Sequence, residues 1–342
     1  MRIVVTGATG NVGSAVVRAL EPTGHEIVEV SRRPRGTGPG HIAADLTTAD
    51  LDLVVRGADA VVHLAWQIQP SRDPDQTRAV NVVATRRLLE AVVRQEVPAF
   101  VAASSIAAYS PRHDGEPVDE SWPTDSPSSA AYAREKAYDE RLFDLFEQRA
   151  PAMRVVRLRP AFIFQRAAAA AQRRLFAGPF LPTSLLRPGR LPALPVPRGL
   201  RLQAVHADDV AAAVAAAVKR PVSGAFNLAG DGLLRRDELA ALLGTRGVDV
   251  PPRLTRAALQ TAWQAHLVPA PGALFDALMR LPVMSSARAA HELDWHPRHT
   301  AAEALAELLA GLREGSGGDT PVLATSPRFA GSTTTKGAPD GG

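Results

Sequence analysis

The stretch AYAREKAYDE, residues 131–140, places Lys136 four residues after Tyr132, and the whole chain contains only three lysines and three tyrosines. A spacing of four puts two side chains on one face of a helix, one turn apart. A phenol, whose ordinary pKa is about 10, transfers protons poorly at neutral pH unless a neighbouring cation stabilises its anion. The alternative is a solvated helix face on which the lysine is incidental. We interpret Tyr132 and Lys136 as an acid–base pair in which the ammonium lowers the pKa of the phenol.

A second pattern of this kind is TGATGNVG, in which glycines recur at every third position between a β-branched run and a helical pattern. Gly7 permits a tight turn, Gly10 lets the backbone approach a pyrophosphate, and Gly13 lets the helix pack closely on a sheet. The amides near Asn11 and Val12 then point towards the phosphates, at the positive end of the helix dipole. In this strand–turn–helix context the pattern predicts a dinucleotide-binding loop.

The second expected strand ends in VEVSRRP, where a carboxylate would accept hydrogen bonds from the ribose of NAD and repel a 2′-phosphate. Ser31, Arg32 and Arg33 supply a hydroxyl and two cations instead, which favours NADP, with NAD still possible. The competing interpretation is that these arginines are solvated loop charges. Asp45, which follows the next strand-like segment, could accept a hydrogen bond from the adenine amino group.

The elements that would position these residues alternate along the chain. Short apolar runs predict strands at residues 2–7, 25–33, 59–66, 99–105 and 154–160. Helical patterns separate them, at residues 11–24, 77–97 and 130–149. Strands that alternate with helices of this length form parallel βαβ units, so we predict an α/β fold with a doubly wound parallel sheet.

The pattern changes beyond about residue 165, where the chain becomes Pro-rich and irregular. We therefore expect a dinucleotide-binding domain at residues 1–165, with elements at about 200–230 that return to the sheet. Residues 166–199 and 231–312 are expected to form a smaller, mostly helical substrate lobe. Few apolar side chains follow, so residues 313–342 are predicted to be a disordered tail.

Composition narrows the classes of function. The chain has no cysteine, which excludes disulfides and thiolate metal sites and is compatible with a reducing cytoplasm. It has neither a basic-then-apolar leader nor an apolar run of about 18 residues, so we expect a cytoplasmic protein without a membrane span. The net charge of +4 comes mainly from dispersed arginines without a basic block, so no nucleic-acid partner is predicted.

Nine motifs, taken in order along the chain, resemble those of extended short-chain dehydrogenases/reductases, in the NAD-dependent epimerase/dehydratase family: TGATGNVG, HLAW, NVVATRRLLEA, SSIAAY, YAREK, LRPAFIF, VHADDVA, FNLAG and ARAAHELDWHP. The resemblance covers about residues 1–312 and implies a Rossmann sheet with a small C-terminal substrate lobe. It implies a catalytic set of Ser105, Tyr132 and Lys136, in which Ser105 donates a hydrogen bond to a substrate carbonyl. It also implies that further residues line the cofactor, namely Asp45, Leu46, Ala65, Asn81 and Pro160. In relatives, two long helices of one subunit pack against the same two helices of a second subunit. The resemblance therefore implies a homodimer whose interface consists of residues 80–95 and 131–148.

The resemblance leaves several reactions open. Sugar-nucleotide dehydratases of the family carry an Asp-Glu pair where this chain has Ile106 and Ala107, so dehydration is not expected. A nucleotide-sugar 4-epimerase needs only the Ser/Tyr/Lys set and remains an alternative, and so does a non-catalytic NADP sensor. We favour NADPH-dependent reduction of a small ketone or aldehyde, or the reverse oxidation of an alcohol.

Other candidate residues receive structural interpretations. Asp208 and Asp209 precede a helical run, so we expect them to cap that helix and to interact with its dipole rather than to perform acid–base chemistry. The histidines of the C-terminal part lack a carboxylate or thiolate at ligand spacing, so no metal is predicted and they are interpreted as surface residues: His291, His296 and His299. Tyr109 is expected to help wall the site, and Tyr138 to serve packing.

Overall fold

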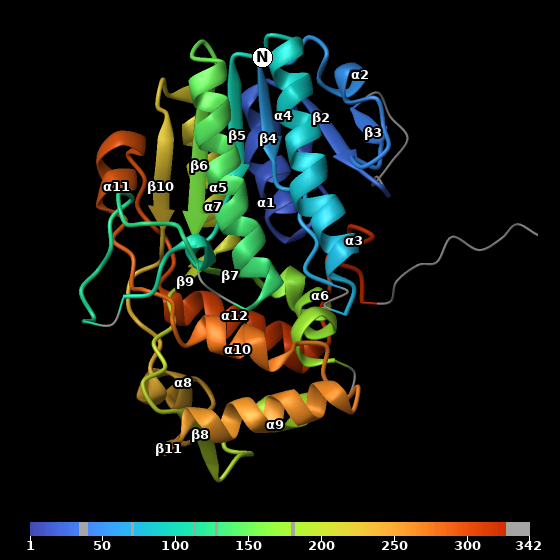
Figure 1. Ribbon diagram of the computed structural model, residues 1–342. Helices are drawn as coiled ribbons and strands as arrows, with labels where there is room; N and C mark the ends of the chain where they lie inside the picture. The colour runs from blue at the N-terminus through green and yellow to red at the C-terminus, as the bar shows by residue number, and fades with distance from the viewer. Residues whose placement is uncertain (34–39, 70–71, 113, 127–128, 179–181, 326–342) are drawn as a thin grey trace, which may run out of the picture.

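A parallel sheet of seven strands forms the larger part of the molecule, as the computed structural model shows (Figure 1). The structure describes residues 1–33, 40–69, 72–112, 114–126, 129–178 and 182–325. The strand order is β10-β6-β5-β4-β1-β2-β3. Their bounds are β1 Arg2–Thr6, β2 Glu26–Ser31, β3 His41–Ala43, β4 Ala60–His63, β5 Ala99–Ala103, β6 Arg154–Pro160 and β10 Gly224–Leu228.

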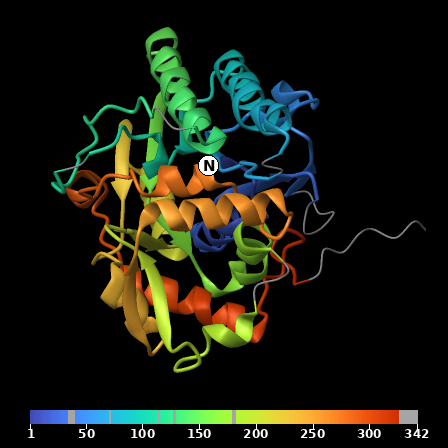
Figure 2. The same cartoon turned by 60° about the horizontal axis from the view of Figure 1, so that its bottom comes forward.

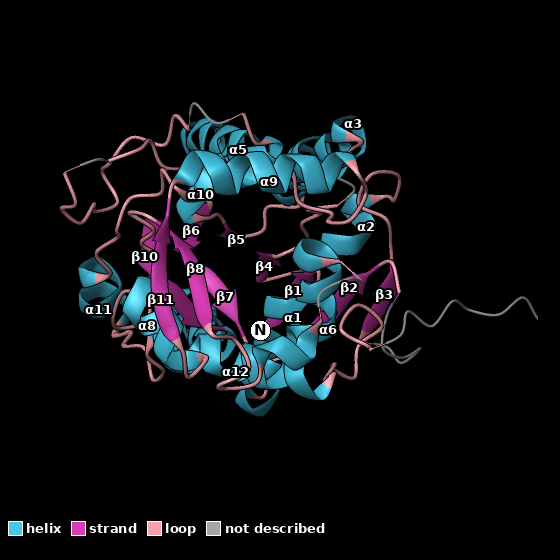
Figure 3. Ribbon diagram, turned by 90° about the horizontal axis from the view of Figure 1, so that it is seen from below, coloured by secondary structure: helices cyan, strands magenta, loops and turns pink. Residues whose placement is uncertain are grey.

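Helices cover both faces of this sheet because successive strand residues point to opposite sides. Ile3 and Val5 of β1 belong to a core cluster with α1 (Asn11–Leu20) and α7 (Ala207–Lys219). Val4 belongs to a separate cluster on the other face. The helices that supply that second cluster are α2 (Leu51–Val55), α4 (Ala84–Arg94) and α5 (Ala131–Arg149). Figure 3 shows the resulting layers, with α5 and α1 on opposite sides of the strands.

The smaller lobe lies beyond the carboxyl ends of the strands (Figures 1 and 2). It contains α8 Arg236–Leu242, α9 Pro252–Gln264 and α10 Gly272–Leu278, with a two-stranded sheet of β8 Ala193–Pro197 and β11 Arg246–Val250. A second small sheet pairs β7 Phe162–Phe164 with β9 Ala204–His206. The remaining helices are α3 Pro74–Arg78, α6 Ala169–Gln172, α11 Ala287–Leu293 and α12 Ala301–Glu314.

The α/β fold class predicted from the sequence is confirmed, and one expectation about the rest of the chain needs correction. The lobe was expected to be mostly helical, and besides its helices it contains the parallel pair of β8 and β11. The predicted tail does not begin at residue 313, because α12 continues to Glu314 and Thr320 and Leu323 are 2% and 1% exposed. The rest of that segment, 326–342, lies outside the described residues. None of the described helices is both long and apolar enough to cross a membrane.

Candidate active site

Ser105 stands just after β5, where the carboxyl ends of the parallel strands meet the first turn of α5. It caps a single 3₁₀ turn, Ile106–Ala108, and its Oγ accepts a hydrogen bond from the Ala107 amide at 3.1 Å. The serine is 6% exposed. The hydrogen bond within this turn fixes the orientation of the Ser105 hydroxyl, which lies next to the first turn of α5.

Tyr132 approaches the serine from the first turn of α5. Its hydroxyl donates a hydrogen bond to Ser105 Oγ at 3.2 Å. A serine hydroxyl can accept two hydrogen bonds and donate one. Because the Ala107 amide and the Tyr132 hydroxyl occupy both acceptor positions, the hydrogen of Ser105 is the part of the group left for a substrate oxygen.

The pKa of Tyr132 differs from the sequence-based expectation. Burial raises the pKa of its phenol above 10, and the hydrogen bond with Ser105 opposes that rise only in part. Lys136 does not contribute to this shift. The expected lowering of the phenol pKa by the ammonium is therefore wrong for this structure. Tyr132 is a neutral phenol at pH 7, which is the form that can give a proton away.

Lys136 lies one turn further along α5 and is 4% exposed. Its ammonium donates a hydrogen bond to the carbonyl oxygen of Ala103 at 2.7 Å, which ties α5 to the end of β5. Burial lowers the pKa of Lys136 to about 8, although nearby carboxylates, those of Asp139, Glu140 and Glu135, act in the opposite direction. Lys136 therefore still carries its proton at neutral pH.

Trp66 is a site residue that the sequence analysis did not assign. Its ring covers the ammonium of Lys136, with Nζ 3.3 Å from the ring centroid, in cation–π geometry. The same ring meets Tyr132 edge to face, with centroids 5.8 Å apart. The signal available in the sequence was its place directly after Ala65 in the motif HLAW. Trp66 thus contacts both members of the acid–base pair.

Asn81 belongs to a π-helical turn, Ala79–Val83, a form that is frequent at functional sites. It is fully buried, and its amide group joins two neighbouring segments. Asn81 Nδ2 donates to Glu135 Oε2 at 2.7 Å and to the carbonyl oxygen of Gln67 at 2.8 Å, while Oδ1 accepts from the Gln67 amide. Asn81 therefore holds the loop after β4 against α5, close to the catalytic residues.

The glycine loop is built as the sequence pattern predicts. Gly7 has a φ of +70°, and a Cβ there would lie 2.6 Å from the Ala65 amide nitrogen. A Cβ on Gly13 would lie 2.1 Å from the carbonyl oxygen of Gly7. Side chains are thus excluded at both positions. The loop packs against the chain that follows β4, and α1 begins at Asn11. A backbone turn of this kind at a helix N-terminus is chemically suited to a pyrophosphate.

Asn11 also joins the loop to a later part of the chain. Its Nδ2 donates to the carbonyl oxygen of Ile163, and Gln165 Nε2 donates to Asn11 Oδ1 at 2.8 Å and to its carbonyl oxygen at 2.6 Å. Val12 follows in the first turn of α1, partly buried against the main core. Pro160, at the end of β6, pairs in register with Leu228 of β10.

The end of β2 contains polar groups that fit the adenosine part of a dinucleotide. Ser31 Oγ is buried and has no hydrogen-bond partner among the described residues. Arg32 beside it is exposed and lies close enough to Asp45 to help lower the pKa of that carboxyl, after the larger effect of hydrogen bonds from Thr47. Leu46 is 8% exposed in the core, so its side chain supports the segment from inside.

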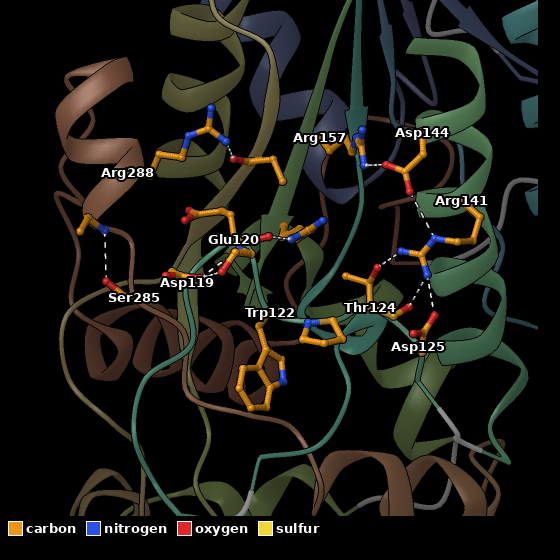
Figure 4. A pocket seen from close by; sticks show the side chains of 15 residues that line it. Asp119, Glu120, Trp122, Thr124, Asp125, Arg141, Asp144, Arg157, Ser285 and Arg288 are labelled. Carbon is orange, nitrogen blue, oxygen red and sulfur yellow. Dashed lines mark hydrogen bonds and ion pairs between the residues drawn. The ribbon is translucent and has the colours of Figure 1, made fainter. Parts of the chain in front are cut away.

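A small cavity of about 220 Å³ opens beside Tyr132. Its lining comes from the start of α5, the loop after β4, and α10 of the lobe, and includes Ala130, Gln67 and Leu274. A larger cavity of about 770 Å³ lies along the loop of residues 119–125 and contains none of the predicted catalytic residues (Figure 4). Its arginines are paired with acids, as with Arg141 against Asp125.

Two tyrosines are placed differently from the sequence-based expectation. Tyr109 does not wall the site, because it is 2% exposed in the core and its hydroxyl donates to Asn227 Oδ1 at 2.8 Å and accepts from Arg159. Tyr138 is not a packing residue, because it is 47% exposed on α5.

A histidine cluster at the start of α7 also corrects an expectation. His206, not the acidic pair, is the N-cap of α7, while Asp208 and Asp209 occupy its first turn. His299 is not a plain surface residue, because its ring lies 4.1 Å from that of His206 and its Nδ1 is 3.0 Å from Asp209. With Glu307 these histidines bring potential ligand atoms within 4.8 Å of one another. Both ring nitrogens of His206 already contact protein groups, the Asp208 amide and Glu307, so we describe the cluster as a hydrogen-bonded cap.

The sequence model of the NAD dependent epimerase/dehydratase family matches residues 3–229 of this chain. This chain belongs to that family. The matched range includes every residue that the sequence analysis placed in the site, from Gly7 to Pro160. The structural neighbours are extended short-chain dehydrogenases/reductases, and several of them were solved with NAD bound.

Three similar proteins illustrate the range of the family. An uncharacterized protein of Mycobacterium tuberculosis is 29% identical over 251 residues, 71% of this chain and 23% of that protein. An L-arabinose 1-dehydrogenase (NAD(P)(+)) of Haloferax volcanii is 35% identical over 105 residues, 30% of this chain and 41% of that protein. A short-chain dehydrogenase/reductase superfamily protein from Agrobacterium tumefaciens, with bound NAD, has a TM-score of 0.68 and 27% identity over 92% of this chain and 98% of its own. The chain thus spans about a quarter of the length of its mycobacterial relative.

Proposed function

We propose that the protein is an NADPH-dependent reductase of small ketones or aldehydes, which also catalyses the reverse oxidation of the alcohols. The observation that carries the proposal is the Tyr132–Ser105 hydrogen bond of 3.2 Å with a phenol that burial keeps neutral. A neutral phenol beside a fixed hydroxyl is the arrangement that carbonyl reduction requires. The nascent alkoxide needs a proton donor, and the carbonyl needs a hydrogen bond that orients it.

The roles of the residues follow from this geometry. A nicotinamide held by Lys136 and the glycine loop would supply the hydride for the carbonyl carbon in the reductive direction. The free hydrogen of Ser105 binds the carbonyl oxygen and orients it towards the phenol. Tyr132 gives its proton to that oxygen as negative charge develops on it. Lys136 has N–H groups beyond the one bound to Ala103, with which it can hold ribose hydroxyls of the cofactor.

The space beside Tyr132 supports a small substrate. The cavity of about 220 Å³ is below the range of about 300–1,000 Å³ that is usual for sites of drug-sized ligands. Its walls include the apolar side chains of Ala130, Ala273 and Leu274. Trp66 packs against the tyrosine ring edge to face. A compact, partly apolar carbonyl compound matches this lining better than a nucleotide sugar does.

The preference for NADP over NAD rests on the end of β2. Arg32 is exposed there, beside a buried Ser31 hydroxyl that lacks a partner among the described residues. Arg32→Asp should weaken NADPH binding by about tenfold or more, the loss expected for one charge-assisted hydrogen bond, and should leave NADH binding unchanged or improved. Fluorescence titration of both cofactors measures this. An equal loss for both would mean that Arg32 does not contact the 2′-phosphate.

The proposed partner is a second copy of the chain. Large apolar side chains are exposed on or next to the two helices that relatives pair: Tyr138 and Leu145 on α5 are 47% and 40% exposed, and Val83 before α4 is 41% exposed. Light scattering at micromolar concentration should give about twice the monomer mass. A species of 36.2 kDa would contradict the dimer. A cytoplasmic location belongs to the same proposal, in keeping with a chain that has no cysteine.

The decisive experiment is a substrate panel. Simple ketones and aldehydes with NADPH are assayed for loss of nicotinamide absorbance, beside UDP-sugars assayed for epimerisation. Turnover of the carbonyl compounds alone supports the reductase. Epimerisation of UDP-sugars alone would replace the reductase with a nucleotide-sugar 4-epimerase, for which the same Ser105, Tyr132 and Lys136 suffice. Cofactor binding with no turnover of either class, retained in Tyr132→Phe, would favour an NADP-sensing protein.

A further inference from the structure

A segment that follows α12, Ser316–Thr325, lies against the glycine loop, and we name it the strap. We propose that the strap is part of the cofactor-binding site and that Thr320 is a positioning residue for the glycine loop. The proposal rests on the cofactor binding put forward above. Figure 1 draws the strap in red beside α6, although the sequence separates it from the glycine loop by the whole length of the fold.

The contact with the glycine loop is a buried hydrogen bond. Thr320 Oγ1 donates to the carbonyl oxygen of Thr9 at 2.6 Å, and the two threonines are 2% and 3% exposed. Thr9 stands between Gly7 and Gly10, so the bond holds the peptide from which the loop turns into α1. Gly10 in turn donates its amide to the carbonyl oxygen of Gly7 at 2.9 Å. Fixing Thr9 therefore restrains the backbone whose amides would face a pyrophosphate.

The other end of the strap is anchored to the segment around α6. Leu323 is 1% exposed and packs on Ala168 and Ala171. Arg174 donates to the carbonyl oxygens of Val322 and Ala324 at 2.7 and 2.8 Å. The burial of this leucine side chain removes apolar surface from water, which favours one defined place for a short segment.

The strap is also a folded turn rather than an extended chain. The Gly318 amide donates to the carbonyl oxygen of Leu323 at 3.0 Å, and the amides of Leu323 and Ala324 donate back to Thr320. A Cβ on Gly317 would lie 2.6 Å from the carbonyl oxygen of Leu323. These contacts hold the strap in one conformation, in which the Thr320 hydroxyl points towards Thr9.

Linkage gives the proposal a second consequence. If docking of the strap favours the loop conformation that binds the cofactor, then the bound cofactor must favour docking of the strap by the same factor. Bound cofactor should therefore protect the strap from hydrogen exchange. A merely structural role for Thr320 does not predict this protection.

Three variants of the full chain test the proposal. Thr320→Val removes the hydroxyl at nearly constant shape, Thr320→Ser retains it, and Thr245→Val removes a similar hydroxyl-to-carbonyl bond in the lobe, that to Leu191 at 2.8 Å. Dissociation constants of NADPH and NADH are measured by fluorescence titration. We expect Thr320→Val to bind the preferred cofactor about three- to tenfold more weakly, the equivalent of one neutral hydrogen bond, and the other two variants to match the wild type. An unchanged constant for Thr320→Val, or an equal loss in Thr245→Val, would overturn the proposal.

Amide hydrogen exchange tests the strap independently of any substrate. In the cofactor-free protein, peptides that contain residues 7–13 should exchange faster in Thr320→Val than in the wild type or Thr320→Ser. In the wild type, saturating cofactor should slow exchange at Leu323 and Ala324. Equal exchange of the glycine loop in all three proteins would refute the strap's role. A wild type that binds neither NADPH nor NADH would instead refute the proposed function, while the exchange of the free protein would still decide about the loop.

Discussion

Helices α5 and α9 represent two different ways of building this molecule. Eight residues of α5 are buried, and half of them are ionisable: Glu135, Lys136, Asp139 and Glu140. No residue of α9 in the lobe is buried, and its Leu254 is 60% exposed. Three of the buried ionisable residues of α5 have hydrogen-bond partners outside the helix: Glu135 binds Asn81, Lys136 binds the carbonyl oxygen of Ala103, and Glu140 binds Arg159. These bonds fix α5 in one position. Helix α9 buries no such group. The proposed catalytic groups thus stand on a helix with many buried contacts, whereas α9 can change in sequence with little cost in stability.

The buried network that holds α5 explains its rigidity. Arg159 of β6 binds the carboxylate of Glu140 through two nitrogens, each at 2.8 Å. Ser104, next to the catalytic serine, donates to the same carboxylate. The pKa of Glu140 is held below its usual value by Arg159 in spite of burial. The helix is therefore locked to β6 four residues beyond Lys136, which keeps the catalytic turn in register with β5.

The largest expected effect concerns the chemistry on the rigid side. Tyr132→Phe removes the proton donor while the ring still packs against Trp66, so turnover should fall by about 10²–10⁴. Cofactor affinity should stay within about twofold, since the hydroxyl bonds to Ser105 rather than to the glycine loop. Steady-state kinetics on the best substrate of the panel and a cofactor titration measure both. A variant that keeps a tenth of the activity would contradict the assigned role.

Stability should differ sharply between the two helices. Phe143→Ala in α5 removes a ring that is 2% exposed and should lower the free energy of unfolding by about 3–5 kcal/mol. Leu254→Ala in α9 should change it by no more than about 0.5 kcal/mol. Urea unfolding of both variants with the wild type tests this. Comparable losses would show that α9 contributes to the core after all.

Lys136 predicts a pH dependence of cofactor binding. The pKa of Lys136 is about 8, so its side chain is mostly protonated and charged below pH 8. Affinity should therefore be constant near pH 7 and should fall by up to about tenfold per pH unit above pH 8, as the ammonium loses its proton. The phosphate of NADPH does not change its charge there, because its pKa is about 6. Lys136→Met should bind weakly at every pH. A wild-type profile that stays flat to pH 9.5 would exclude the ammonium from cofactor binding.

The smallest effect is expected from the lobe. Leu274→Ala on α10 enlarges the cavity beside Tyr132, so the ratio of kcat/KM between a bulky and a small ketone should rise by about tenfold. Leu267→Ala serves as the control, because Leu267 does not line that cavity and is 48% exposed. Affinity for the cofactor should not change in either variant. A selectivity that stays constant in Leu274→Ala would place the substrate elsewhere.

Local spacing explains what the sequence could predict. The glycine loop and the Tyr132–Lys136 pair are short-range patterns, and the structure places them as expected, with Ser105 within hydrogen-bond distance of Tyr132. The ladder of parallel strands was also readable, because fully buried strands appear as continuous apolar runs.

The features that the sequence did not predict depend on contacts between distant residues. Trp66 covers Lys136 only because β4 and β5 are neighbours in the sheet. The bond between Thr320 and Thr9 joins residues 311 positions apart. The prediction of a disordered tail rests on the average composition of residues 313–342, which is polar. An average does not reveal that two side chains, Thr320 and Leu323, anchor part of this segment. The raised pKa of Tyr132 is caused by burial. The spacing of Tyr132 and Lys136 in the sequence gives no information about burial.

The stacking of Trp66 on Lys136 also gives the site a built-in optical reporter. The chain has four tryptophans, and Trp66 contacts both Tyr132 and Lys136, the proposed catalytic side chains. Indole emission depends on nearby charges and is absorbed by reduced nicotinamide. The difference between the emission spectra of the wild type and Trp66→Phe therefore isolates one signal from the catalytic centre. That signal can follow the arrival of a cofactor and the loss of the Lys136 proton in real time, without knowledge of the substrate.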